Sequence, residues 1–80
     1  MSRYKITVVY PRKNPYYGYH EDFYYTAMES FDNDCDAVMF AIKEGKEYRK
    51  TTGNFSISIE VKKIYDISYD YLETILDIVI

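Results

Sequence analysis

Residues 55–62 alternate between apolar and polar side chains, and this pattern limits the fold more than any other feature. The apolar positions are Phe55, Ile57, Ile59 and Val61, and the polar positions are Ser56, Ser58, Glu60 and Lys62. A period of two predicts a β-strand, reaching to about residue 65, with one face buried and the other in water. The buried face needs a second layer of structure to cover it.

A helix at residues 33–49 is the expected second layer. Asp32 or Asn33 can cap its first turn, because a short polar side chain accepts hydrogen bonds from free backbone N–H groups. Acids at the start and bases at the end complement the helix dipole: Asp34, Asp36, Lys46, Arg49 and Lys50. A stripe of mostly small side chains at helical spacing predicts close packing on a sheet: Cys35, Val38, Ala41, Ile42 and Gly45.

Two further strands are expected before the helix. Residues 4–10 alternate, and Pro11 is predicted to end this strand because proline cannot donate to a central ladder. Residues 11–21 then form a loop, in which Asn14-Pro15 is a turn signal. Residues 22–31 are rich in aromatic side chains and predict a second strand.

The C-terminal segment fits two structures. Residues 70–73 match a capping box, and the apolar residues of 72–79 recur at helical spacing, which favours a short helix. Residues 72–80 also alternate as a strand would, so both alternatives stay open. Residues 78–80 are apolar, and we expect them to pack on the core or to meet another chain, as in a homo-oligomer.

Together with a turn at residues 51–54, these elements predict one α+β domain spanning residues 1–80. The predicted order is β-β-α-β followed by a short C-terminal helix or strand, with a small antiparallel-rich sheet packed on one helix. Eighty residues are enough for one domain at most.

Composition and charge favour a cytoplasmic protein. No apolar run approaches the ~20 residues that a membrane span needs, and no apolar segment of signal-peptide length follows the N-terminus. Cys35 is the only cysteine.

The net charge is −3 and the charges come in blocks, since residues 1–20 carry four bases and residues 21–40 carry six acids. This pattern lacks the uniformly basic footprint of a duplex-binding protein.

No set of residues predicts catalysis, a cofactor or a metal. Residues 32–36 resemble the opening of a calcium-binding loop, but Ala37 and Lys43 stand where that loop needs glycine and glutamate. The acids are therefore interpreted as helix-start residues. His20 has no nucleophile near it in sequence, and acids flank Cys35 and oppose a thiolate there. We expect a protein that is not an enzyme.

The tyrosines are the unusual feature of the sequence. Seven of the eleven fall in residues 4–25, namely Tyr4, Tyr10, Tyr16, Tyr17, Tyr19, Tyr24 and Tyr25. They could cover a sheet that has one face in water, form a protein interface, or stack on nucleic-acid bases. Strand propensity cannot account for the three tyrosines of the 11–21 loop.

We expect a non-enzymatic binding protein that masks a macromolecular partner. Loop tyrosines would supply the anchors, and acids at 21–36 or 66–77 the electrostatic complementarity. The alternative is a homo-oligomeric nucleotide or small-ligand binder, or a single-stranded nucleic-acid-binding protein, with Arg12 or Lys13 holding phosphate. The partner-binding candidates are Arg12, Lys13, Tyr16, Tyr17, Tyr19, His20, Tyr24, Asp32, Asp34 and Asp36.

In size and composition the chain resembles small accessory proteins of bacteriophages and mobile elements, including anti-CRISPR and anti-restriction inhibitors. Such proteins are often single acidic domains rich in Tyr, Ile, Lys and Asp. The resemblance implies a partner in the host cytoplasm, such as a CRISPR–Cas effector or another defence nuclease. It implies no particular site residue.

Overall fold

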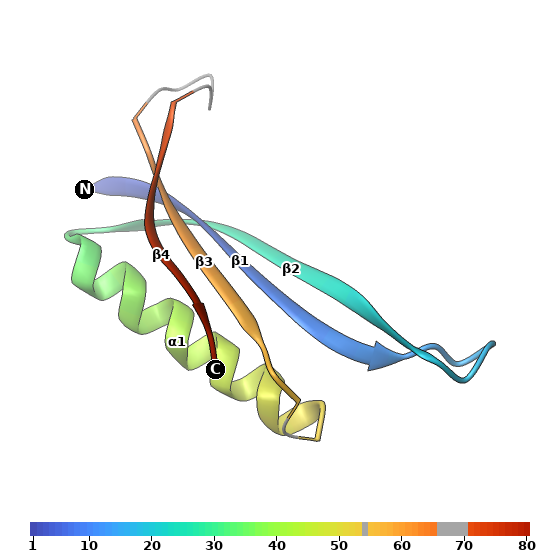
Figure 1. Cartoon of the computed structure of the whole chain (residues 1–80). Helices are drawn as coiled ribbons and strands as arrows, with labels where there is room; N and C mark the ends of the chain where they lie inside the picture. The colour runs from blue at the N-terminus through green and yellow to red at the C-terminus, as the bar shows by residue number, and fades with distance from the viewer. Residues whose placement is uncertain (54, 66–70) are drawn as a thin grey trace.

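In the residues that the structure describes, four strands form one antiparallel sheet, and one helix covers one of its faces (Figure 1). The computed structural model describes residues 1–53, 55–65 and 71–80. The elements are β1 (Ser2–Lys13), β2 (His20–Phe31), α1 (Asp34–Thr51), β3 (Ser58–Ile64) and β4 (Leu72–Val79). The strand order is β2-β1-β3-β4. The predicted α+β class and the order β-β-α-β are confirmed.

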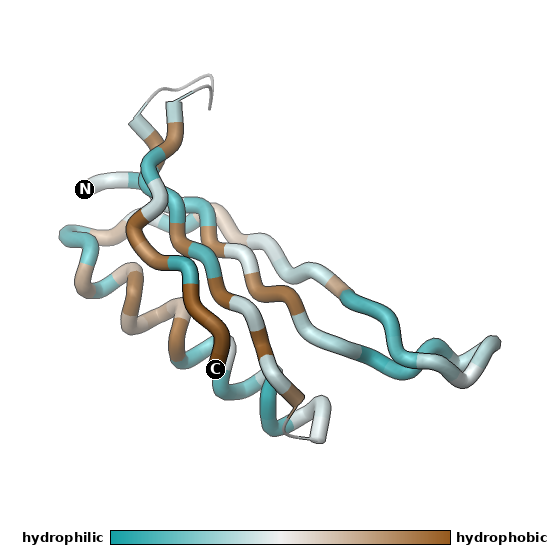
Figure 2. The backbone as a smooth tube through the Cα atoms, viewed as in Figure 1, coloured by the Kyte–Doolittle hydropathy of each residue, from teal (hydrophilic) through white to brown (hydrophobic). Residues whose placement is uncertain are grey.

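The core lies between α1 and the two central strands. Its largest fully buried side chains alternate along β1 and along residues 57–61, which include the start of β3: Tyr4, Ile6, Val8, Ile57, Ile59 and Val61. Burying each aliphatic side chain of this kind contributes roughly 1.5–3 kcal/mol. The helix contributes Ala37, Ala41 and Gly45, all small and buried, so its backbone lies close to the sheet. Figure 2 shows hydrophobic stretches along the strands beside α1 and along α1 itself, whereas the far end of the β1–β2 hairpin is hydrophilic or neutral.

The first strand is longer than predicted, because Pro11 does not end it. Pro11 continues the ladder opposite Asp22. Backbone groups alternate sides along a strand, and Asn14 N–H donates to the Tyr19 carbonyl of the β2 side. Even-numbered residues of β1 therefore bond to β2, and Pro11 turns its nitrogen toward β3. The pairing with β3 ends at Val9, so Pro11 removes no ladder bond.

The C-terminal segment is the strand β4, so the favoured short helix is wrong and the alternative is right. Ile57 and Ile80 exchange two backbone hydrogen bonds of 2.9 and 2.8 Å. Ile78 and Ile80 pack against the core, whereas Val79 is exposed. The C-terminal end is thus covered largely by its own domain.

Two smaller expectations are corrected or lie outside the described residues. Phe55 is 47% exposed and does not share the buried face of Ile57, Ile59 and Val61; it precedes β3, and its ring packs against His20 instead. Asn54 of the predicted turn and Asp70 of the predicted capping box are outside the described residues. In the part of the chain that is described, no helix has the length and apolar character required to cross a bilayer.

Gly45 is required by the close approach of α1 to the sheet. A Cβ atom added there would lie 2.9 Å from Cγ1 of Ile59, closer still to its Cδ1, and 3.3 Å from Cδ1 of Ile80. Alanine would gain about 1 kcal/mol of helix propensity, but overpacking costs roughly 1–3 kcal/mol. We expect Gly45→Ala to lower the free energy of unfolding by about 1 kcal/mol net, measured by urea denaturation.

The matched comparison is Gly45→Ala in an Ile59→Val background, which removes the Cδ1 atom that the new methyl group meets. There the destabilisation by alanine should be smaller, because only the contacts with Cγ1 of residue 59 and Cδ1 of Ile80 remain. Equal effects of Gly45→Ala in the two backgrounds would contradict the contact with Ile59.

Candidate functional site

The β1–β2 hairpin ends in a loop at residues 14–19 that Asn14 organises. The Asn14 N–H donates to the Tyr19 carbonyl at 2.7 Å, and the Gly18 N–H donates to the Asn14 carbonyl at 3.0 Å. The Asn14 side chain accepts from the N–H groups of Tyr16 and Tyr17 at 2.8 and 3.0 Å. Its amide also donates to Glu21 at 2.8 Å. Gly18 has a φ of 74°, which glycine adopts without strain.

This loop presents three tyrosines to solvent, here called the tyrosine tip: Tyr16, Tyr17 and Tyr19. Their exposed fractions are 89%, 75% and 53%. The rings of Tyr17 and Tyr19 stack, with centroids 5.8 Å apart and planes inclined by 19°. The tip lies at the end of an arm that extends past α1 (Figure 1). These side chains are accessible and locally ordered by the loop rather than by the core.

The basic candidates beside the tip diverge. Arg12 and Lys13 are consecutive residues of β1 and therefore point to opposite faces of the hairpin. The Arg12 guanidinium lies over the ring of Phe23, 5.6 Å from its centroid, on the helix side of the sheet. The His20 ring packs on Phe55 at 5.1 Å. The arrangement does not gather Arg12 and Lys13 around one phosphate.

Two of the other N-terminal tyrosines, Tyr10 and Tyr25, pack between the sheet and α1. Tyr10 stacks on Tyr48 of α1 with centroids 4.4 Å apart, and Tyr25 contacts the same ring at 5.4 Å. Burial, reinforced by the nearby Tyr10, Tyr25 and Glu44, raises the pKa of Tyr48. Tyr24 points away from the helix, opposite Val9, and is 69% exposed. The sheet-coating interpretation therefore holds for Tyr10 and Tyr25.

The acidic candidates lie at the N-terminus of α1. Asn33 is the N-cap, and its side chain accepts from the Asp36 N–H at 2.8 Å. Asp32 and Asp36 are exposed. The twelve residues of β2 separate this end from the tip, a distance of roughly 40 Å at 3.3 Å per residue. The predicted acidic and tyrosine groups therefore do not form one continuous site.

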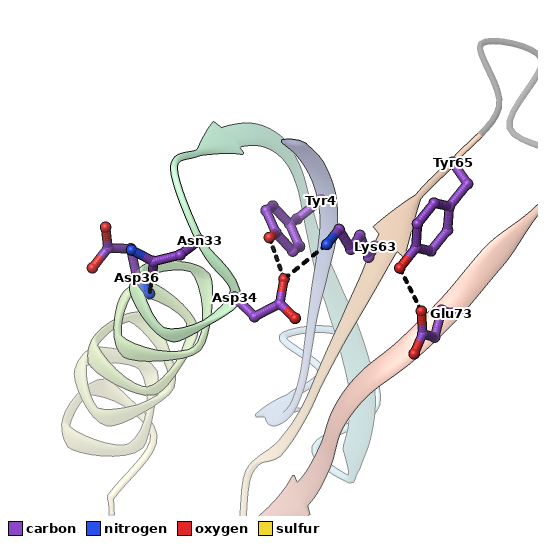
Figure 3. A network of polar contacts seen from close by, with 7 residues as sticks. All are labelled: Tyr4, Asn33, Asp34, Asp36, Lys63, Tyr65 and Glu73. Carbon is purple, nitrogen blue, oxygen red and sulfur yellow. Dashed lines mark hydrogen bonds and ion pairs between the residues drawn. The ribbon is translucent and has the colours of Figure 1, made fainter. Parts of the chain in front are cut away.

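Asp34 has a structural role that the sequence did not reveal (Figure 3). The buried Tyr4 hydroxyl donates to its carboxylate at 2.5 Å, and Lys63 Nζ lies 3.3 Å from the same oxygen. The hydrogen bond from Tyr4, with help from Lys63, lowers the pKa of Asp34. Burial and the bond to Asp34 raise the pKa of Tyr4. A buried tyrosine hydroxyl needs a hydrogen-bond partner. This requirement was the one signal in the sequence for a polar contact to Tyr4.

The acids expected at 66–77 are only partly described. Asp66 and Asp70 lie outside the described residues. Glu73 accepts a hydrogen bond of 2.6 Å from Tyr65, also drawn in Figure 3, and Asp77 lies opposite Glu60 on the helix-free face. Within residues 1–53, 55–65 and 71–80, no group of three His, Cys, Asp or Glu is arranged to hold a metal ion.

Comparison with known proteins gives no match: no protein-family model, curated protein or solved structure is significantly similar to this chain.

The Tyr4–Asp34–Lys63 cluster should make stability depend on acid pH. The pKa of Asp34 in the folded protein lies below its ordinary value of 3.8, so its stabilisation is present above that pH. It is lost as pH falls through the folded pKa. We expect the urea midpoint to fall less between pH 7 and pH 3 in Asp34→Asn than in wild type.

Asp36→Asn is the matched control, because Asp36 shares the first turn of α1 but not the contact with Tyr4. It should keep the wild-type pH dependence. The assignment is wrong if Asp34→Asn loses as much stability on acidification as wild type does.

Proposed function

We propose that this chain is a non-enzymatic binding protein that engages a macromolecular partner through the tyrosine tip. The observation that carries the proposal is the exposure of three tyrosines on a loop held by five hydrogen bonds around Asn14. Side chains that only coat a sheet would lie on the strands, and these do not.

The tip has the physical properties of a binding hot spot. Each aromatic side chain can bury about 150–250 Å², and tyrosine loses little side-chain entropy on binding. Because Asn14 already orders the loop, binding does not have to order it, which favours affinity. The tip also projects from the body, so it can enter a concave surface that the sheet and helix cannot reach.

A protein surface is a better partner than nucleic acid. The near-parallel rings of Tyr17 and Tyr19 could stack on a base, but Arg12 and Lys13 point to opposite faces, and Arg12 already lies over Phe23. Glu21 and Asp22 follow the loop directly and would repel phosphates. The nucleotide and single-stranded nucleic-acid alternatives are therefore less well supported.

The resemblance in size and composition to phage inhibitors makes a bacterial defence nuclease, such as a CRISPR–Cas effector, the first partner to test. Masking such an enzyme requires only a stable complex over its functional surface. The tip would supply the anchor, and the nearby acids Glu21 and Asp22 would complement a basic groove.

The test replaces Tyr16, Tyr17 and Tyr19 together by serine. The fold should survive, because all three side chains are exposed, so the urea midpoint should stay within experimental error of wild type. Partner capture from bacterial lysate, or inhibition of a purified effector, should fall at least tenfold because the apolar contact area is lost.

Tyr71→Ser is the control, because Tyr71 is also exposed but lies on the β4 side of the sheet. It should retain partner binding. Loss of folding in the triple variant would show that the tyrosines are core residues, and unchanged capture by the triple variant would exclude the tip as the interface.

A further inference from the structure

The outer edge of β2 presents a row of unpaired backbone groups. β2 pairs with β1 through its odd-numbered residues, as the bond from Asn14 to Tyr19 fixes. The even-numbered residues turn their N–H and C=O groups outward: His20, Asp22, Tyr24, Thr26, Met28 and Ser30. In the described parts of the chain, no strand pairs with this edge.

This edge is unusually regular for an exposed one. Proteins commonly protect edge strands with charged side chains, above all lysine, or with proline, bulges or short length. β2 has twelve residues, contains neither proline nor lysine, and carries its acids only near its ends, at Glu21, Asp22 and Glu29. Its register with β1 runs without a shift. The other edge strand, β4, has a register shift at its pairing with Val61 and Lys62. β2 is therefore the better template for strand addition.

We propose that two copies of the chain pair antiparallel through β2 and form one sheet of eight strands, four from each copy. In such a pair, outward-facing even residues must meet outward-facing even residues. The two-fold axis then passes through one residue of β2 and its own copy. The longest overlaps place the axis at Tyr25, which pairs residues 20–30, or at Thr26, which pairs residues 21–31.

Charge selects between these two registers. An axis at Tyr25 places Glu21 directly opposite Glu29, which is destabilising. An axis at Thr26 places Glu21 opposite Phe31 and Glu29 opposite Phe23, so no like charges oppose each other directly.

The axis at Thr26 also brings complementary side chains together on the helix-free face. Tyr24 meets Met28 of the partner copy twice, once on each side of the axis. These residues are 69% and 41% exposed in the single chain, and a thioether packs well against an aromatic ring. Thr26 meets itself, which is a favourable cross-strand pair. The second copy thus covers exposed apolar side chains and also gives hydrogen-bond partners to the backbone N–H and C=O groups on the outer edge of β2.

The salt dependence follows from the same register. Glu21 and Glu29 of opposite copies lie diagonally, about 7–8 Å apart. At this separation added salt screens their repulsion only in part. Dimerisation should therefore strengthen modestly as sodium chloride is raised from 20 to 300 mM.

The first experiment measures mass by light scattering and sedimentation at protein concentrations up to 200 µM. Wild type should be a dimer, and Thr26→Lys should be a monomer, because two ammonium groups would meet on the axis. Thr74→Lys, an exposed threonine on the other edge strand β4, is the matched control and should remain a dimer. A monomeric wild type, or a dimeric Thr26→Lys, overturns the proposal.

A second experiment tests the register itself. In a Cys35→Ser background, Thr26→Cys should form an intermolecular disulfide under mild oxidation, because paired Cα atoms about 5.5 Å apart lie within disulfide reach. Thr74→Cys in the same background should stay reduced. Cross-linking of Thr74→Cys in place of Thr26→Cys would show that the copies meet elsewhere. The triple serine variant of the tip should still dimerise, which separates this proposal from the proposed function.

Discussion

In the part of the chain that the structure describes, one helix has to cover the buried face of the sheet, and this constraint decides which residues can join the core. α1 has 18 residues and is therefore about 27 Å long at 1.5 Å per residue. β1 and β2 have 12 residues each, which is about 40 Å at 3.3 Å per residue. The strands are longer than the helix, so the far end of their hairpin has no second layer of structure to pack against (Figure 1). The exposed arm is a consequence of this difference in length.

The same difference explains why one residue type serves three purposes. Tyr4 lies under the helix and is fully buried, with its hydroxyl bonded to Asp34. Tyr10 lies near the end of the helix, where its ring stacks on Tyr48 and it remains partly exposed. Tyr17 lies beyond the helix and faces water. An amphipathic side chain tolerates all three environments, so position along the hairpin, more than chemistry, sets the role of each tyrosine.

The sequence was informative wherever a single segment carried the whole signal, as in the alternation of residues 57–62 and the N-cap of α1. It was misleading where a neighbouring strand decided the outcome. Pro11 is harmless only because β3 ends opposite Val9, and residues 72–80 are a strand because β3 offers an edge to pair with. Exposure of the tip could be predicted because no strand pattern includes it. The contacts of Tyr4 with Asp34 and of Asp34 with Lys63 join distant segments, so no local pattern encodes them.

Pro11 has a consequence for how the arm avoids uncontrolled association. Beyond Val9 the inner side of β1 has no register with β3, so the arm has a second edge there. The outward backbone positions on that side belong to Pro11 and Lys13. Proline has no N–H to offer an incoming strand, and a lysine resists burial, and both are recognised gatekeepers against aggregation. The β1 side of the arm is therefore protected against strand addition, which leaves the β2 edge and the tyrosines at the tip as the parts of the arm that can make contacts.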